Sequence, residues 1–198
     1  MSSFLLFCVA TIPVETINTL LRTPRHNFFL LVRDTSSSFD APSSAPPVQP
    51  FDTGFVGFSR ERIRSFVDEL VPDTQEGHPG MEVEPGQYCL LDEQSANNNT
   101  VVFGKALSSL HDRDPEAMTE DESEQWLMQC EENPDAPKDL WREYRVKFEE
   151  AESLSTILSM ESDFTQKLYN DQFVAEHTNA DGVFTVGRAQ RAFEGSQT

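Results

Sequence analysis

Short apolar runs separated by polar stretches recur along the chain and predict a small sheet. Residues 27–33, Asn-Phe-Phe-Leu-Leu-Val-Arg, have the length and aromatic content of a buried strand rather than a helix. Residues 87–92 and 100–103 indicate two further strands joined by a polar tip at 94–99, which favours a hairpin. From 144 to 148, Tyr, Val and Phe alternate with charged residues, the pattern of a strand with one face in water.

Helical spacing appears between these runs. Ser59 is suited to cap a helix with apolar residues at every third or fourth position, and Pro72 is expected to end it. The capping-box spacing at 119–122 predicts a short acidic helix. Residues 153–160 carry leucine and isoleucine at helical spacing, and Asp163 is expected to cap a following helix.

The composition changes abruptly after the first of these strands. Residues 35–54 hold five serines and four prolines, too little apolar surface to offset chain entropy, which indicates a flexible insertion. An Asn-Ala-Asp-Gly turn precedes a last short strand at 182–186, and residues 189–198 are expected to fray. We therefore predict a single α+β domain over residues 1–198, with a mixed or antiparallel sheet packed by about four helices.

Charge is the strongest bias in the composition. The 198 residues carry a net charge of −19, and 37% of them are hydrophobic. Residues 1–70 have a net charge of −1, whereas residues 71–198 have −18. Such a chain repels a phosphate backbone, so nucleic acid is not expected as a partner and a basic protein is. The simpler interpretation is that the acids keep the protein soluble.

The cysteines and the N-terminal run bear on the compartment. Cys8, Cys89 and Cys130 are odd in number and widely spaced, which indicates no disulfide framework and favours a cytoplasmic protein. Residues 4–10 resemble the apolar core of a signal peptide, which leaves export as the alternative, although no Lys or Arg precedes them. No run approaches the ~18–20 apolar residues of a membrane span, so no membrane partner is expected.

Sequence motifs for catalysis and cofactor binding are missing. The chain contains no G-x-S-x-G, no G-x-x-x-x-G-K-[ST] and no G-x-G-x-x-G. Residues 177–182 resemble the middle of a calcium loop, but His177 and Arg188 occupy the places of its first and last ligands, so a turn is favoured. The four histidines are too dispersed for paired ligand spacing. We predict no cofactor and no metal site.

Several short motifs occur together in an order that resembles one family. They are Leu-Leu-Val-Arg at 30–33, Leu-Leu-Asp at 90–92, Tyr-Arg-Val at 144–146, Ser-Leu-Ser at 153–155, Ser-Asp-Phe at 162–164 and Asp-Gly-Val-Phe at 181–184. They resemble domain of unknown function 6924, a family of small bacterial and fungal proteins, and the resemblance extends over about half of the chain. The insertion and the acidic segment at 112–135 have no counterpart, and Thr185-Val186 replaces an expected Arg-Gly. The resemblance implies a shared α+β fold and, since the family has no established activity, no catalytic residue.

Polar residues inside these apolar motifs are the candidate site residues. They are Arg33, Asp92, Arg145, Asp163 and Asp181. Each also has an ordinary local interpretation as a strand-end salt bridge, a helix cap or a turn, and we favour those roles.

Three functional hypotheses follow. The leading one is a non-catalytic protein–protein interaction or regulatory module that binds a basic protein. The alternative is an enzyme or small-ligand domain with a site assembled from dispersed residues, which a cavity joining Arg33, Arg145 and carboxylates would favour. The third is an acidic antidote or nucleic-acid mimic, for which surface carboxylates at phosphate-like intervals would be the evidence.

Overall fold

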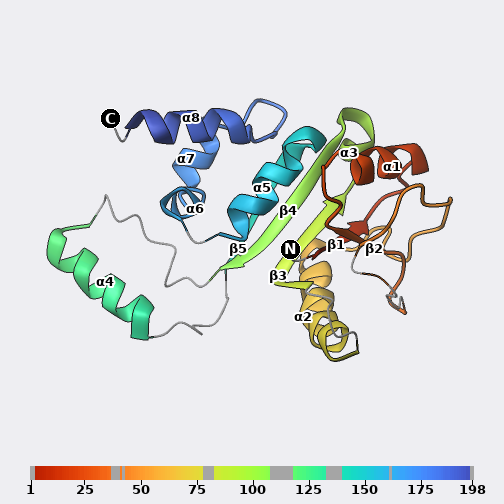
Figure 1. The fold of residues 1–198 in the computed structure, drawn as a ribbon, viewed down its shortest axis with the longest axis horizontal. Helices are drawn as coiled ribbons and strands as arrows, with labels where there is room; N and C mark the ends of the chain where they lie inside the picture. The colour runs from red at the N-terminus through yellow and green to blue at the C-terminus, as the bar shows by residue number, and fades with distance from the viewer. Residues whose placement is uncertain are drawn as a thin grey trace.

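Five strands of the described chain form one mixed sheet in the order β2-β1-β3-β4-β5 (Figure 1). The computed structural model describes residues 3–36, 41, 43–77, 83–107, 118–132, 140–160 and 162–196. The strands are β1 (Ser3–Cys8), β2 (Phe29–Val32), β3 (Val83–Leu91), β4 (Thr100–Leu107) and β5 (Leu140–Lys147). β1 is parallel to β2 and β3, whereas β3–β4 and β4–β5 are antiparallel pairs. The prediction of one α+β domain with a mixed sheet is confirmed.

The apolar run at residues 4–10 supplies most of β1, an interior strand of the sheet. Phe4 and Leu6 of β1 pack into the hydrophobic cluster on one face, and Leu5 and Phe7 pack into the cluster on the other. A parallel strand covered on both faces is apolar at every position, which explains why this run does not alternate. The run is therefore a core segment of the fold.

Helices cover the two faces of the sheet unequally. They are α1 (Val14–Arg22), α2 (Arg60–Gly77), α3 (Glu93–Asn98), α4 (Glu120–Glu132), α5 (Ala151–Leu158), α6 (Asp163–Lys167), α7 (Asp171–Glu176) and α8 (Val186–Ser196), with a 3-10 turn at Phe148–Glu150. Residues of α1, α5, α6 and α8 belong to one core cluster, whereas Ile63 and Val67 of α2 belong to the other. Figure 1 shows α2 on the side of the sheet opposite to α5 and α8.

The two parallel connections therefore cross opposite faces. The β1–α1–β2 connection crosses the face with the first cluster, and the β2–α2–β3 connection crosses the other. The crossing direction changes between β1 and β3, at the carboxyl ends of the parallel strands. In open α/β sheets such a switch point leaves a crevice in which ligands bind.

Helix α2 begins where the sequence predicts but extends further. Ser59 caps it, because the Arg62 N–H donates to the Ser59 hydroxyl (3.3 Å). The prediction that Pro72 ends this helix is wrong, since the helix continues to Gly77. A proline removes one hydrogen bond to the preceding turn and leaves the residues after it able to stay helical.

The hairpin between β3 and β4 contains a helix. The strands pair antiparallel as predicted, but the polar tip at 94–99 folds as α3. Asp92 and Ser95 form a reciprocal capping box, and Asn99 ends the helix in the left-handed conformation at φ 53°. The tip is thus helical because its polar residues satisfy the helix ends locally.

The C-terminal segment also differs from the sequence prediction. The strand expected at 182–186 is reduced to a bridge between Thr178 and Phe184, and α8 starts at Val186. Residues 189–196 were expected to fray, but they continue this helix, with Ala189 fully buried. Apolar side chains at helical spacing pack α8 into the first hydrophobic cluster, and this outweighs the fraying of a chain end.

The second half of the insertion is bound to the domain. Residues 37–40 and 42 lie outside the described residues. In the part that follows, the backbone N–H of Ser44 donates to a carbonyl of β2 (2.8 Å). The side-chain amide of Asn18 in α1 donates to the carbonyl of Val48 (3.2 Å) and its oxygen accepts the N–H of Val48 (2.7 Å). These bonds fix the chain that leads to residues 51–56.

Tyr88 of β3 lies across β4 at Gly104. Tyr88 pairs with Gly104, and Gly104 pairs with Glu143 of β5, so the three residues form a row across the sheet. A Cβ atom at position 104 would lie 2.3 Å from Cζ of Tyr88. Glycine is required here because the tyrosine ring rests on the backbone of β4.

We expect Gly104→Ala to lower the free energy of unfolding by about 1–3 kcal/mol, the usual cost of overpacking. The added methyl displaces the Tyr88 ring, and with it the contact between β3 and β5. Urea unfolding followed by circular dichroism measures the change.

Two further variants make this result specific. Gly195→Ala in α8 adds a methyl with no atom within 4 Å, so it should be neutral or stabilising. In a Tyr88→Ala background, Gly104→Ala should lose most of its cost. An undiminished cost in that background would contradict the proposed clash.

Candidate functional site

A cluster of three arginines and two carboxylates covers the β4–β5 half of one sheet face. Its members are Arg60, Arg64, Asp92, Glu143 and Arg145. Glu143 and Arg145 alternate along β5 and so point to the same face. Arg60 and Arg64 lie one turn apart on α2, so both reach this face from the same side of the helix.

The strongest contact in the cluster joins Arg145 to Asp92. The guanidinium of Arg145 binds both carboxylate oxygens, with 3.0 Å from Nη1 to Oδ1. Nη1 also donates to the hydroxyl of Thr100 (3.1 Å). Asp92 in turn accepts the N–H of Ser95 (3.1 Å), so the pair links the end of β3, the start of α3 and β5. Both side chains are largely buried: Arg145 is 12% exposed and Asp92 is 20% exposed.

Asp92 is held in its charged form. Partial burial raises the pKa of Asp92, but the hydrogen bonds and the charge of Arg145, with the N–H of Ser95, outweigh it and lower the pKa to about 2. A bidentate arginine favours the carboxylate over the neutral acid. At neutral pH this group is therefore an anion and a poor general acid.

Glu143 is the second acceptor of the cluster. It accepts the hydroxyl of Tyr88 (2.5 Å) and Nη2 of Arg64 (3.1 Å), and it pairs with Nε of Arg60 (3.4 Å). Arg60 also reaches Asp92 (3.3 Å), which joins the two halves of the cluster. Among the described residues, Nη1 of Arg60 is buried without a hydrogen-bond partner. Burial and the neighbouring carboxylate raise the pKa of Tyr88, which therefore stays protonated.

Two of the five candidate site residues meet in this cluster. A third, Arg33, lies apart from it, at the carboxyl end of β2. Asp92 and Arg145 are ion-paired. Arg33 follows β2, exposed, with its guanidinium carbon 5.3 Å from the centre of the Phe51 ring. Arg33 and Arg145 therefore do not converge on one cavity with the carboxylates.

The remaining two candidates have local roles. Asp163 is the exposed first residue of α6, and the predicted cap role is wrong because the Ser162 hydroxyl accepts the Thr165 N–H (3.2 Å) instead. Asp181 lies in the predicted turn, and its backbone carbonyl accepts the Gln94 side chain (2.8 Å). Neither carboxylate joins the cluster.

Sequence reasoning missed the other members of the cluster. From the sequence alone, Arg60 and Arg64 fall on the polar side of the helix capped by Ser59, where exposure to solvent is expected, and the charged residues of β5 fall on the wet face of their strand. The spacing of Arg60 and Arg64 and the alternation of β5 were visible signals. Only the folded structure brings α2 and β5 together, through the contacts of Arg60 and Arg64 with Glu143.

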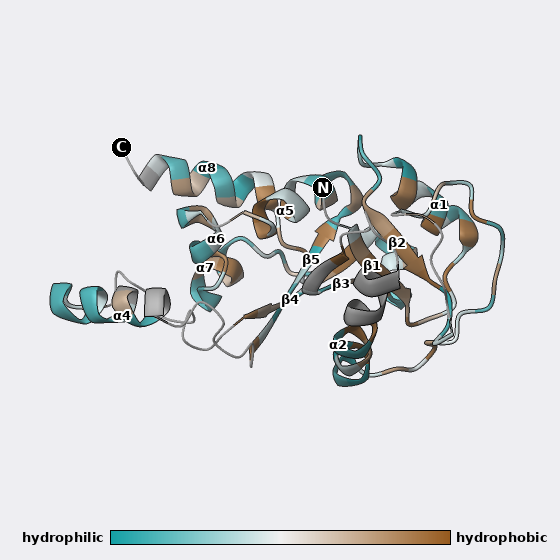
Figure 2. Cartoon of the chain, turned by 60° about the horizontal axis from the view of Figure 1, so that its bottom comes forward, coloured by the Kyte–Doolittle hydropathy of each residue, from teal (hydrophilic) through white to brown (hydrophobic). Residues whose placement is uncertain are grey.

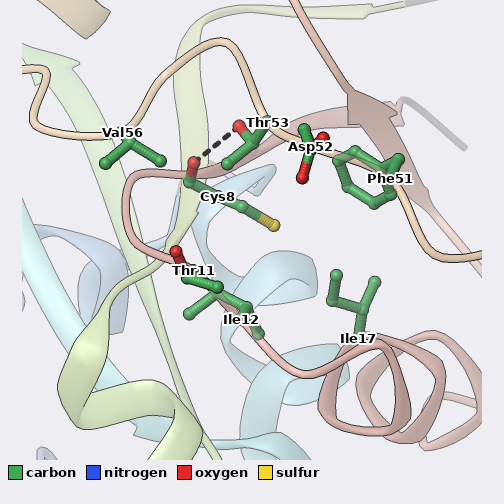
Figure 3. Close-up of a pocket in the computed structure, with 8 residues that line it drawn as sticks. All are labelled: Cys8, Thr11, Ile12, Ile17, Phe51, Asp52, Thr53 and Val56. Atoms are coloured by element: carbon green, nitrogen blue, oxygen red, sulfur yellow. Dashed lines mark hydrogen bonds between the residues drawn. The ribbon is translucent and has the colours of Figure 1, made fainter.

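A separate cleft lies at the carboxyl end of β1, between the start of α1 and residues 51–56, which follow β2 (Figure 3). Its volume is about 90 Å³. It is lined by Cys8, Thr11, Ile12, Ile17, Phe51, Asp52, Thr53 and Val56. Burial raises the pKa of the Cys8 thiol to about 12, so this cysteine is neutral and is no nucleophile.

Metal ligands and membrane spans were also sought in the described part of the chain. No group of three or more His, Cys, Asp or Glu residues there lies close enough to hold a metal ion. None of the described helices combines the length and the apolar character needed to cross a bilayer. The free cysteines Cys8 and Cys89 are both buried.

Comparison with family models, with curated proteins and with solved structures finds no match to this chain. The resemblance to domain of unknown function 6924 therefore stays a prediction. The site has to be interpreted from its own geometry.

We expect Asp92→Asn to destabilise the protein by about 1–3 kcal/mol at pH 7, because Asn keeps the helix cap but loses the charge facing Arg145. The folded-state pKa of Asp92 lies below its ordinary value, so the carboxylate stabilises the fold at pH above about 4. That contribution is lost as the pH falls from about 4 towards 2.

Urea unfolding of both proteins between pH 7 and pH 2.5 measures this dependence. The difference in the free energy of unfolding between the wild type and Asp92→Asn should become smaller towards pH 2.5. Glu93→Gln, at the exposed neighbouring residue, should differ little from the wild type throughout. A difference for Asp92→Asn that stays constant with pH would contradict the role of the ion pair.

Proposed function

We propose that this chain is a non-catalytic binding module that recognises a basic protein, with helix α4 as its main contact surface. One observation carries the proposal. α4 lies to one side of the sheet in both views, and its 13 residues include six acids and no Lys or Arg (Figures 1 and 2). Figure 2 shows the helix mostly in the colour of hydrophilic residues.

The start of α4 is well defined by local contacts. The Thr119 N–H donates to the Glu122 carboxylate (2.9 Å), and the Glu122 N–H donates to the Thr119 hydroxyl (3.4 Å). This is the predicted capping box, and the acids of the first turn also favour the helix dipole. Glu120, Asp121 and Glu124 are exposed, so their carboxylates are accessible to a partner.

An exposed methionine adds an apolar contact to this surface. Met128 in the same helix is 59% exposed. A flexible thioether beside carboxylates suits a partner surface that mixes lysine or arginine with apolar groups. Electrostatic attraction would steer such a partner towards the acidic chain.

The charged cluster on β3–β5 supports binding rather than catalysis. Asp92 and Glu143 are occupied by arginines and by Tyr88 within the fold. The buried thiols of Cys8 and Cys89 have raised pKa values and stay protonated. These groups hold the domain together, whereas the exposed carboxylates of α4 are accessible to a partner.

We expect the triple variant Glu120→Gln, Asp121→Asn, Glu124→Gln to bind a basic peptide about 5- to 10-fold more weakly than the wild type. The probe is a synthetic peptide of alternating lysine and serine, measured by biolayer interferometry at low and physiological salt. Binding by the wild type should weaken as salt screens the charges.

A second triple variant removes the same number of charges elsewhere. Glu15→Gln, Glu93→Gln, Glu194→Gln alters exposed acids of α1, α3 and α8, and should change affinity less than twofold. Circular dichroism checks that α4 persists in the first variant. Equal weakening by both variants would show that overall charge, not α4, attracts the peptide, and would contradict the proposal.

A further inference from the structure

The cleft at the end of β1 is lined by both apolar and polar side chains, and one of them is charged. Ile12, Ile17 and Phe51 supply apolar surface, and the neutral thiol of Cys8 lies among them. Of the eight lining residues, Asp52 alone carries a charge. Figure 3 shows the Asp52 carboxylate directed towards the space between Cys8 and Ile17.

The wall that carries Asp52 is fixed to the sheet by hydrogen bonds. The Thr53 hydroxyl donates to the carbonyl of Cys8 (2.8 Å), as Figure 3 shows. The Gly54 N–H donates to the backbone carbonyl of Arg33 (2.8 Å), and the Gly57 N–H donates to the backbone carbonyl of Val9 (3.1 Å). A cleft whose wall is already in place loses little conformational freedom when a ligand enters.

The Asp52 carboxylate differs from the acids of the cluster. Among the described residues it has no hydrogen bond and no ion pair, whereas Asp92 and Glu143 are occupied by arginines. Arg33, close to the Phe51 ring, does not line the cleft. A carboxylate beside an aromatic ring is a favourable place for a ligand cation.

The size of the cleft restricts the ligand. Its volume of about 90 Å³ is smaller than the ~150 Å³ cavity that accommodates benzene in an engineered protein. An unbranched chain of about three or four carbons is of the right size, whereas a nucleotide or an aromatic ring is too large.

We propose that this cleft binds a short primary alkylammonium group. The carbon chain lies against Ile12, Ile17 and Phe51, and the ammonium pairs with Asp52. This site is independent of α4 and goes beyond the proposed function.

The test is a titration of isotope-labelled full-length protein with n-butylammonium chloride, followed by NMR. Resonances of residues 11–17 and 51–57 should shift and saturate at millimolar ligand. 1-Butanol, which has the same chain without the charge, should bind at least fivefold more weakly, and butyrate should not bind. In Asp52→Asn, butylammonium should bind no better than butanol.

Control variants separate the cleft from general attraction to an acidic surface. Glu15→Gln removes an exposed acid of α1 outside the cleft and should leave the affinity unchanged. Equal affinity for butanol and butylammonium, or undiminished binding to Asp52→Asn, would overturn the assignment of the ammonium to Asp52. No shift at the cleft with any of these probes would overturn the site itself.

A lysine derivative identifies the source of the ammonium group. Nα-acetyl-lysine methylamide carries the same group on a peptide backbone. Binding as tight as that of butylammonium would assign the site to a lysine side chain of a protein, and exclusion would assign it to a free amine. Neither result depends on the peptide experiment with α4.

Discussion

The ion pair between Arg145 and Asp92 ties the outermost strand, β5, to the end of β3 and the start of α3. Apolar side chains of α2 pack on one face of the sheet, and towards β5 their place is taken by Arg60, Arg64 and the residues that they contact. Asp92 is also the cap of α3, so a single carboxylate fixes a strand end, a helix start and the outermost strand. A neutral side chain at this position would leave the Arg145 guanidinium, 12% exposed, without its main counter-charge.

The sequence predicted the sheet where burial alone decides the structure. The runs at 27–33 and 144–148 contain β2 and the end of β5, because β2 is covered on both faces and β5 packs Tyr144 and Val146 into the core. α3 was missed because its polar residues resemble a turn, and its helical signal was only the spacing of Asp92 and Ser95. The helix that starts at Val186 was missed because the run at 183–186, with three apolar residues, is too short to distinguish a strand from a helix.

The candidate site could be predicted only in part, for a similar reason. Asp92 and Arg145 stand out as polar residues in apolar motifs, yet their partnership depends on the pairing of β3, β4 and β5. The need for Gly104 depends on the same register, because only there does the Tyr88 ring cross the strand. Asp163 and Asp181 are also polar residues within these motifs, but in the folded structure they have only local roles. Motif position therefore identified candidates, and topology decided among them.

The charge of the chain acquires a different meaning once its arginines are located. Arg60, Arg64, Arg142 and Arg145 all form ion pairs with carboxylates of the domain. The excess of acids is thus carried by exposed groups such as those of α4, which attract cations without selecting among them. Selection requires shape as well as charge. In the described structure, the cleft beside Asp52 combines a carboxylate with the apolar side chains of Ile12, Ile17 and Phe51, and this is why it can discriminate a short alkylammonium from other cations.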